Sequence, residues 1–452
     1  MKRFQLLAAA AVVTAAVITP TAQGLASTLS NPSGPVDPNA TLPTTNAVQM
    51  IVDSAHHRLF ISTGLATDSL LVTNNSGVVT HTVALAGADG MTLRNDKLYV
   101  AESGSADIAV INPKSLKVTH RYSTGLGSCP ESVAVVASHY LTFGLSCDRQ
   151  RGSVGVIDTT TTSPTPVIVP ANNLFYNPLV RAVPGSTNAI VANLGSDPSR
   201  VSIVDVAGTP TVTKSLWTLS NGCENLQDLA VSPDGKSFVP ACGAPYEHDA
   251  FSTTDLSQTD SYPTGTYPEA AAFSSNGLKF AGGTGFSYNK VLYVLSTTPG
   301  DHLLGLAADF GTPWDVAPQC LGFSTNGDTI FAVTKAWFGT GTWSYHLHAI
   351  SLARTPVVVS VTAPATSRVG TQLQVTGTLT FADGQQHAVQ LHVSRRLKGV
   401  TTTLPPVTTS GVGNVISFTD TPGAKATATY TVKYTGDVFN KAGSHSAKVV
   451  IH

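Results

Sequence analysis

One pattern returns along most of the chain at intervals of 40 to 50 residues, and it constrains the fold more than any other feature. In its clearest copy, residues 227–238 read as an apolar strand, a tight turn at Pro233-Asp234-Gly235 and a second strand. Residues 269–280 and 319–330 repeat it with Asn-Gly in the turn. Each copy begins with a carboxylate or its amide, at Gln49, Asp89, Glu131, Asn177, Gln227, Glu269 and Gln319.

Each unit continues with two further strands. A third strand often ends in Asp or Asn, as at residues 108–112 and 154–158, and a fourth follows, as at residues 80–84. Four strands per unit at this period are typical of a β-propeller blade. The composition agrees, because 12% charged residues with 39 Gly and 27 Pro suit buried strands joined by turns and exclude a long helix or coiled coil. The sequence therefore predicts an all-β fold with a seven-bladed β-propeller over residues 41–355.

These units resemble the YVTN-type repeats of secreted and surface-layer propellers. They are WD40-like in length but lack the Gly-His and Trp-Asp dipeptides of WD40 repeats. Closure of the ring is open at this stage, because the seventh unit has three clear strands. Its fourth strand comes either from residues 41–47 or from residues 357–361.

The N-terminus has the three-part organisation of a secretory signal peptide. The chain begins with a short basic stretch, Lys2 and Arg3. Residues 4–18 are apolar, and small residues follow as far as Ala26. The apolar run is shorter than the roughly 20 residues of a membrane span, which disfavours the alternative of an uncleaved anchor. We expect a signal peptide at residues 1–26, a linker at residues 27–40, and a secreted, extracellular mature protein without a membrane span.

Four of the five cysteines occupy matching positions in their repeats. Cys129 and Cys223 lie just before a first strand, and Cys147 and Cys242 lie near the end of the second strand. Those ends are neighbours in an antiparallel hairpin, so the sequence predicts two disulfide bonds, Cys129–Cys147 and Cys223–Cys242. Cys320 remains, and we expect it to be a small buried apolar residue.

The repeat ends near residue 356, and residues 356–452 show about seven short strands, the count expected of an Ig-like β-sandwich. The run from Tyr430 to Asp437, followed by Ser444-His445-Ser446, resembles the bacterial Ig-like domain of group 3, which implies a spacer. This module has a net charge of +5 and residues 27–355 have a net charge of −8. A basic module would suit an anionic cell-wall polymer, although ordinary solvated surfaces explain the charges as well.

The residues that begin the repeats are the first candidate site. Asp89, Glu131 and Glu269, with the four amides, would ring one mouth of the central channel. Convergent oxygens of this kind suit a polar or cationic ligand or a metal. The alternative is hydrogen bonding between blades, and the four amides favour it because they make a poor site for a hard cation.

Aromatic residues cluster in loops that open on that same face. Exposed aromatic side chains favour stacking with a sugar or an aromatic partner, whereas a plug that packs the seam of the ring is the alternative. The loop of blade five also holds Glu247 and His248. The candidate ligand-binding aromatics are Trp314, Trp337, Trp343, Phe286, Tyr288 and Tyr246.

No catalytic motif stands out, and His346 with His348 is a weak metal pair because no carboxylate lies near it in the sequence. We therefore expect a monomeric, non-enzymatic binding or adhesion-type protein without cofactor or metal. Its propeller face would recognise a glycan, cell-wall polymer or protein, and the net charge of −1 argues against nucleic acid. The alternatives are a lactonase-like hydrolase or lyase that uses channel-mouth carboxylates and a metal, and a structural cell-envelope component.

Overall fold

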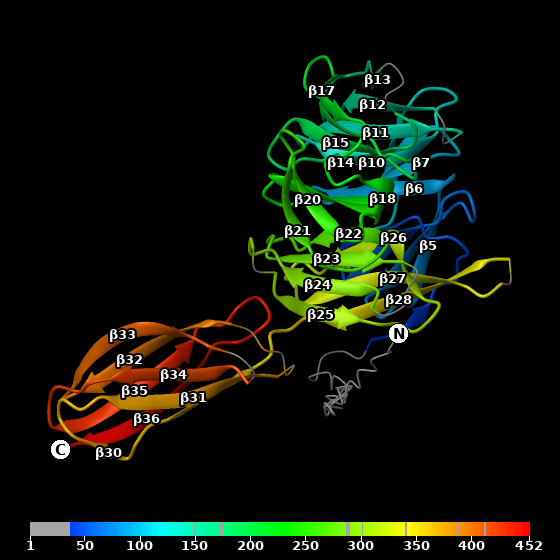
Figure 1. Cartoon of the computed structure of the whole chain (residues 1–452). Coiled ribbons are helices and arrows are strands. Elements are labelled where there is room, and N and C mark those ends of the chain that lie inside the picture. The colour runs from blue at the N-terminus through cyan, green and yellow to red at the C-terminus, as the bar shows by residue number, and fades with distance from the viewer. Residues whose placement is uncertain are drawn as a thin grey trace, which may run out of the picture. The chain divides into compact units, whose positions relative to one another are not determined.

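The computed structural model describes residues 37–148, 151–170, 175–285, 290–300, 302–339, 341–382, 384, 386, 388–410 and 413–452. In these ranges the chain forms strands and loops and no helix, as Figure 1 shows. The predicted signal peptide lies outside the described residues. No helix long and apolar enough to cross a membrane occurs in the described part of the chain.

Within the described ranges the strands form nine sheets, and seven of these have four antiparallel strands. Six of the seven use four strands that are consecutive in the sequence. The first strands of the seven sheets are β2 (Gln49–Asp53), β6 (Ala88–Arg94), β10 (Pro130–Val136), β14 (Pro178–Ala182), β18 (Glu224–Val231), β22 (Pro268–Phe273) and β26 (Asp315–Phe323). They begin within four residues of the repeat starts seen in the sequence.

The remaining strands follow the same order in every sheet. The second strands are β3 (Arg58–Ser62), β7 (Lys97–Glu102), β11 (Tyr140–Ser146), β15 (Asn188–Asn193), β19 (Ser237–Ala244), β23 (Lys279–Thr284) and β27 (Thr329–Trp337). The third strands are β4 (Ser69–Asn74), β8 (Asp107–Ile111), β12 (Gly152–Asp158), β16 (Val201–Asp205), β20 (His248–Ser252), β24 (Leu292–Ser296) and β28 (Trp343–Ser351). The fourth strands are β5 (Val79–Ala84), β9 (Val118–Ser123), β13 (Val167–Ile168), β17 (Thr211–Leu216), β21 (Gln258–Tyr262), β25 (Leu304–Ala308) and, for the last sheet, β1 (Ala40–Thr41).

The first strands lie against one another in a closed cycle. Each contacts the first strand of the next sheet, and β26 contacts β2. The sheets pack face to face, so the second strands are buried along most of their length, as in β3. The fourth strands lie at the outside and are largely exposed and polar, as in β5. Buried strands in most of each sheet explain why so few residues of the chain are charged.

A small hydrogen-bonded turn explains the clearest part of the sequence repeat. The Ser232 hydroxyl donates to the Asp234 carboxylate at 2.6 Å, and Gly235 follows with a φ of 71°. The same turn recurs where Ser274 donates to Asn276 at 2.8 Å and where Ser324 donates to Asn326 at 2.7 Å. An Asp or Asn that accepts this bond, followed by a residue that tolerates positive φ, forms a tight connection between first and second strands.

The N-terminal alternative for ring closure is the one that the structure adopts. Ala40 pairs with Leu347 and Thr41 with His346, so β1 completes the last sheet next to β28. The other alternative is wrong, because residues 357–362 form a strand of the C-terminal sheets. The closing strand has only two paired residues, and side chains of the same segment add hydrogen bonds to β28.

Both predicted disulfide bonds are present, Cys129–Cys147 and Cys223–Cys242, with Cα–Cα distances of 5.0 and 5.4 Å. In each pair the first cysteine lies just before a first strand and the second lies at or near the end of the second strand. Cys320 is a free, buried cysteine, as expected. Burial raises the pKa of its thiol, which therefore stays protonated.

The C-terminal residues form two sheets with strand orders β29-β31-β34 and β30-β36-β35-β32-β33. Their inward side chains, including Val375, Leu391 and Tyr430, form one apolar core, and outward positions are exposed in alternation. The strands are β29 (Val357–Thr362), β30 (Thr366–Ser367), β31 (Leu373–Phe381), β32 (Gln390–Leu397), β33 (Val400–Thr408), β34 (Val415–Asp420), β35 (Ala426–Tyr434) and β36 (Gly443–Ile451).

Sequence reasoning missed β33 because Pro405 and Pro406 interrupt it. The strand lies at the edge of its sheet, where the missing amide hydrogens of proline are tolerated. Its pairing with β32 is irregular between Leu391 and Val393, opposite the two prolines. The Gly436-Asp437 turn has a clear role, since Asp437 accepts hydrogen bonds from the Tyr434 hydroxyl and from the backbone of the following loop.

Candidate functional site

A pocket of about 720 Å³ lies at the centre of the ring, at the end where first strands begin and second strands finish. Within the described part of the chain, residues from the strands or adjoining loops of six of the seven four-stranded sheets line it. Its walls combine polar side chains with the aromatic rings of Trp343 and Tyr345. The predicted mouth of the channel is therefore a real cavity, with a capacity suited to a small ligand.

Five of the seven predicted ring residues line this pocket: Asp89, Glu131, Asn177, Gln227 and Gln319. Gln49 does not, because it is buried and its Oε1 accepts a hydrogen bond from the Met91 backbone N–H at 2.6 Å. Glu269 is not among the lining residues either. It accepts a hydrogen bond from Lys335 Nζ at 2.6 Å, and Lys335 is itself part of the pocket wall.

The bond made by Gln49 belongs to a set that joins neighbouring sheets. Ser132 Oγ accepts from the Val180 N–H at 2.9 Å, and Asp228 Oδ2 accepts from the Ala271 N–H at 3.0 Å. In each case a side chain of one first strand satisfies a backbone donor of the next first strand. Polar residues of the first strands therefore have two roles. Some form hydrogen bonds between neighbouring sheets, and five of the predicted ring residues line the pocket.

Arg181 was not identified from the sequence, and it occupies the channel below the pocket. From β14 its Nη2 donates to Asp228 Oδ1 at 3.2 Å and to Gln319 Oε1 at 2.8 Å, while Nε donates to the Leu229 carbonyl at 3.0 Å. These partners lie on β18 and β26, so one side chain links three sheets. An arginine inside the apolar run of β14 was the signal that could have revealed it.

Burial raises the pKa of Asp228, and the Arg181 guanidinium and two backbone N–H groups oppose that rise. Glu269 behaves similarly, since burial raises the pKa of its carboxyl while Lys335 opposes the change. Both carboxylates therefore depend on a cation for their charge. No group of three or more His, Cys, Asp or Glu side chains in the described ranges is arranged to hold a metal ion.

The predicted tryptophans of the seventh sheet do come together. Trp337 and Trp343 are paired across β27 and β28 with ring centroids 5.4 Å apart, on a hairpin that extends past the neighbouring strands in Figure 1. Trp343 also lines the pocket, and Lys335 Nζ lies 5.7 Å from its ring. Trp314 contacts Phe338 and the ring of His346, with centroids 5.7 and 4.1 Å apart.

The strongly exposed aromatic side chains of the described residues lie on one face of the ring. Loops on the face that carries the pocket join second strands to third strands and fourth strands to the next first strand. Every strongly exposed aromatic residue in the described part of the chain lies in or beside such a loop. These residues are Tyr176, Trp217, Tyr246, Trp337, Phe338 and Trp343. We call the surface formed by these loops and the pocket the aromatic face.

The loop of the fifth sheet only partly matches the prediction. Tyr246 is 50% exposed and its ring centroid lies 5.0 Å from that of Tyr267. His248, expected beside it in the loop, instead begins β20 and is fully buried. Its Nδ1 lies 2.7 Å from the Thr264 hydroxyl and its Nε2 lies 3.1 Å from the Ala270 carbonyl. Phe286 and Tyr288 lie outside the described residues.

His346 and His348 contact residues 37–41, the segment that closes the ring. His346 Nδ1 lies 2.7 Å from Asn39 Oδ1, and His348 Nδ1 lies 2.7 Å from Asp37 Oδ2. Their Nε2 atoms lie 3.1 Å from the hydroxyls of Thr41 and Thr334. All four ring nitrogens therefore have hydrogen-bond partners, and three of these partners belong to residues 37–41, so the two histidines help to hold β1.

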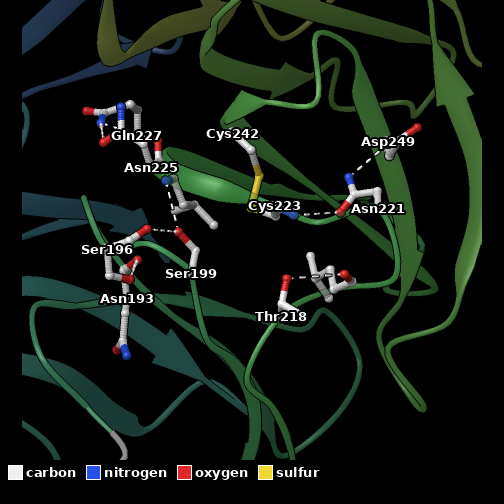
Figure 2. The surroundings of a disulfide bond; sticks show 12 residues. Asn193, Ser196, Ser199, Thr218, Asn221, Cys223, Asn225, Gln227, Cys242 and Asp249 are labelled. Carbon is white, nitrogen blue, oxygen red and sulfur yellow. Dashed lines mark hydrogen bonds between the residues drawn. A yellow bond between two sulfur atoms is a disulfide. The ribbon is translucent and has the colours of Figure 1, made fainter.

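One loop of the aromatic face is anchored by a disulfide bond. Figure 2 shows Ser199 and Ser196 on the loop that follows β15, next to the Cys223–Cys242 bond. Ser199 N–H donates to the Cys223 carbonyl at 3.1 Å, and Ser199 Oγ accepts from the Leu226 N–H at 3.0 Å. This loop is therefore fixed to the start of β18, and its residues Leu194 and Gly195 line the pocket.

No protein-family model and no curated protein sequence matches the chain. Among solved structures it is similar to hydrazine synthase of Kuenenia stuttgartiensis, with a TM-score of 0.52 and 15% identity over 69% of this chain and 96% of that one. It is also similar to the Cps50 (Swd1) β-propeller domain of Myceliophteria thermophila, with a TM-score of 0.50 and 10% identity over 69% and 98%.

A chain of the mitotic checkpoint complex is a third such structure, with a TM-score of 0.52 and 11% identity over 77% of this chain and 99% of that one. At identities this low, the similarity concerns the fold alone. The closed cycle of four-stranded sheets and these similarities lead to the same conclusion, which is that the chain has an all-β, propeller-like fold.

Proposed function

We propose that this chain is a secreted seven-bladed β-propeller of the YVTN type followed by an Ig-like spacer. The closed cycle of seven first strands supports seven blades, and two facing sheets with one core support the sandwich. Two disulfide bonds suit an oxidising compartment, in agreement with the signal peptide expected at residues 1–26. The protein would act outside the cell.

The proposed activity is non-enzymatic recognition of a glycan by the aromatic face. One observation carries it, namely that the six strongly exposed aromatic residues of the described chain all lie on the face that carries the pocket, and one of them, Trp343, lines it. Exposed large apolar side chains on the opposite face are few and aliphatic, such as Val78 and Leu278. An exposed aromatic surface is costly in water, so its concentration on one side indicates a partner.

The chemistry of the pocket favours a sugar over other ligands. Indole rings stack on the apolar faces of pyranose rings, and Trp343 lines the pocket, where it would offer such a face. The acidic and amide side chains that line the cavity, such as Glu131 and Gln227, offer oxygen and nitrogen atoms to sugar hydroxyls. We place the first sugar units in the pocket and further units along the Trp337–Trp343 hairpin.

A glycan array tests this proposal with the full mature protein. We expect the wild-type protein to bind a defined set of glycans and Trp337→Ala to lose roughly tenfold or more in affinity, as for an aromatic hot spot. Leu278→Ala is the matched control, because it removes an exposed apolar side chain from the opposite face. It should bind like wild type.

Equal glycan binding by Trp337→Ala and wild type, or no glycan binding by wild type, would overturn the proposal. Binding of an extracellular protein that Trp337→Ala abolishes would keep the face as a recognition surface but replace the glycan with a protein partner. Thermal melting of both variants shows whether a loss of binding reflects a loss of folding.

A further inference from the structure

Arg200 presents an unusual environment on the aromatic face. The residue is 4% exposed, and its guanidinium Cζ lies 3.2 Å from the centroid of the Trp217 ring. Trp217 is 62% exposed, so an indole that is in contact with solvent covers the guanidinium of a residue that is almost entirely buried. Arg200 ends the disulfide-anchored loop after β15, whose other end lines the central pocket.

The guanidinium lacks the ion pair that two other arginines of the chain have. Its Nε is buried without a hydrogen-bond partner in the described part of the chain, and no carboxylate there forms an ion pair with it. Arg181 and Arg395 are less buried, yet they pair with Asp228 at 3.2 Å and with Asp420 at 2.7 Å. A buried N–H donor without an acceptor destabilises a fold, and the contact of the guanidinium with one aromatic face offsets only part of that cost.

Arg200 is also held in place by its neighbours. Its carbonyl accepts a hydrogen bond from the Asn193 N–H at 3.0 Å. Ser199, the preceding residue, forms hydrogen bonds with Cys223 and Leu226. Figure 2 shows Ser199 near the Cys223–Cys242 disulfide. A guanidinium on a fixed backbone, with its Nε–H unsatisfied, is prepared for an acceptor that the protein itself does not supply.

We propose that Arg200 and Trp217 form a carboxylate subsite of the aromatic face and that the ligand is a glycan bearing an acidic sugar. This inference rests on the proposed function and names its ligand class. The planar fork of arginine matches the two oxygens of a carboxylate. Trp217, which is largely exposed, rotates from the guanidinium and stacks on the sugar ring that carries the acid.

The net negative charge of residues 27–355 would restrict the binding of acidic sugars to the Arg200 subsite. Residues 27–355 have a net charge of −8, so the surface in general repels anions. A single buried cation without a protein partner would then accept a carboxylate only where the sugar also stacks on indole. A neutral sugar would leave the Nε–H unsatisfied and would gain only the stacking contact.

Isothermal titration with D-glucuronate and with D-glucose tests the subsite, since the two sugars differ only in the group at C6. We expect wild type to bind glucuronate more tightly than glucose and Arg200→Gln to lose roughly 10- to 100-fold in glucuronate affinity, as for a charge-assisted pair. Arg94→Gln, an exposed arginine on the opposite face, is the control and should bind like wild type. Tryptophan fluorescence should change on binding in wild type and stay constant in Trp217→Phe.

Folding is checked by the melting temperature, and Arg200→Gln should melt no lower than wild type because it removes a charge that has no ion-pair partner and a buried N–H that has no acceptor. Equal glucuronate affinity in wild type and Arg200→Gln, equal affinity of wild type for both sugars, or no glucuronate binding would each overturn the subsite. If Trp337-dependent glycan binding persists in any of these cases, the proposed function stands and only its acidic ligand class is wrong.

Discussion

At the scale of single residues, the buried polar side chains are the ones whose roles depend on partners from other sheets. Arg181 stays charged inside the ring because Asp228 and Gln319 reach it from two other sheets. His248 is accommodated at the start of β20 because a hydroxyl and a carbonyl satisfy its two nitrogens. Their polar atoms are thus satisfied by chain segments that the local sequence does not reveal.

His248 should make the fold sensitive to mild acid. Burial lowers the pKa of its imidazole to about 4, although the Ala270 carbonyl opposes the change. Below about pH 6.5 the unfolded chain binds a proton that the folded chain does not, so stability falls by about 1.4 kcal/mol per pH unit until the pH approaches 4. Urea unfolding of the wild type at pH 7.5, 5.5 and 4.5 should show this decline.

His248→Gln should be less stable than wild type at pH 7.5 but should lose less stability between pH 6.5 and 4.5. His81→Gln, which changes an exposed histidine, is the control and should keep the wild-type slope. Parallel slopes for wild type and His248→Gln would contradict this account.

At the scale of elements, the tight turn between first and second strands shows how one local sequence is used in different surroundings. Gly235 and Gly277 follow an Asp and an Asn and have φ values of 71° and 70°. A Cβ on Gly235 would lie 2.3 Å from the Pro184 carbonyl oxygen, whereas the nearest atom to a Cβ on Gly277 is 3.8 Å away. The same turn is therefore packed against the neighbouring sheet in one copy and open in the other.

These two glycines form a matched pair for measurement. Gly277→Ala should cost about 1 kcal/mol because alanine is strained at positive φ. Gly235→Ala carries the same strain plus the clash with Pro184, so it should cost at least about 2 kcal/mol. Denaturant unfolding of both variants measures the difference, and equal losses would show that the neighbouring sheet moves away freely.

At the scale of the whole molecule, ring closure depends on a short strand and a few side chains. β1 contributes two residues to the last sheet, and Leu42 N–H adds a bond to the Tyr345 carbonyl at 2.9 Å. Asp37, Asn39 and Thr41 add bonds to the two histidines of β28. The seam between the first and last sheets is thus secured mainly by polar contacts of residues 37–41.

A double-mutant cycle on Asp37 and His348 tests the contribution of this seam to stability. Asp37→Ala and His348→Gln should each destabilise the protein, and the double variant should show a coupling energy of about 1.5 kcal/mol, as for a hydrogen bond to a charged group. Denaturant unfolding at pH 7 supplies the four free energies. A coupling energy of zero would mean that the contact does not secure β1.

The sequence alone determined the repeat, because strand period, turn residues and cysteine positions all follow from local patterns. It located the first strands, both disulfide bonds and the loops that carry Trp337 and Trp343. It missed β33, whose two prolines are tolerated only because the strand lies at a sheet edge. Which strands lie at an edge depends on the tertiary arrangement and cannot be seen in the local sequence.

Only the tertiary structure decided which polar residues face the pocket and which join sheets. Gln49 and Asp89 occupy matching positions in their repeats, yet one satisfies a neighbouring backbone and the other lines the cavity. Arg181 and Arg200 also differ in their partners, since Arg181 meets a carboxylate from another sheet and Arg200 meets an indole. The partner of a buried polar group comes from distant segments, so local patterns determine the strands but not the contacts between them.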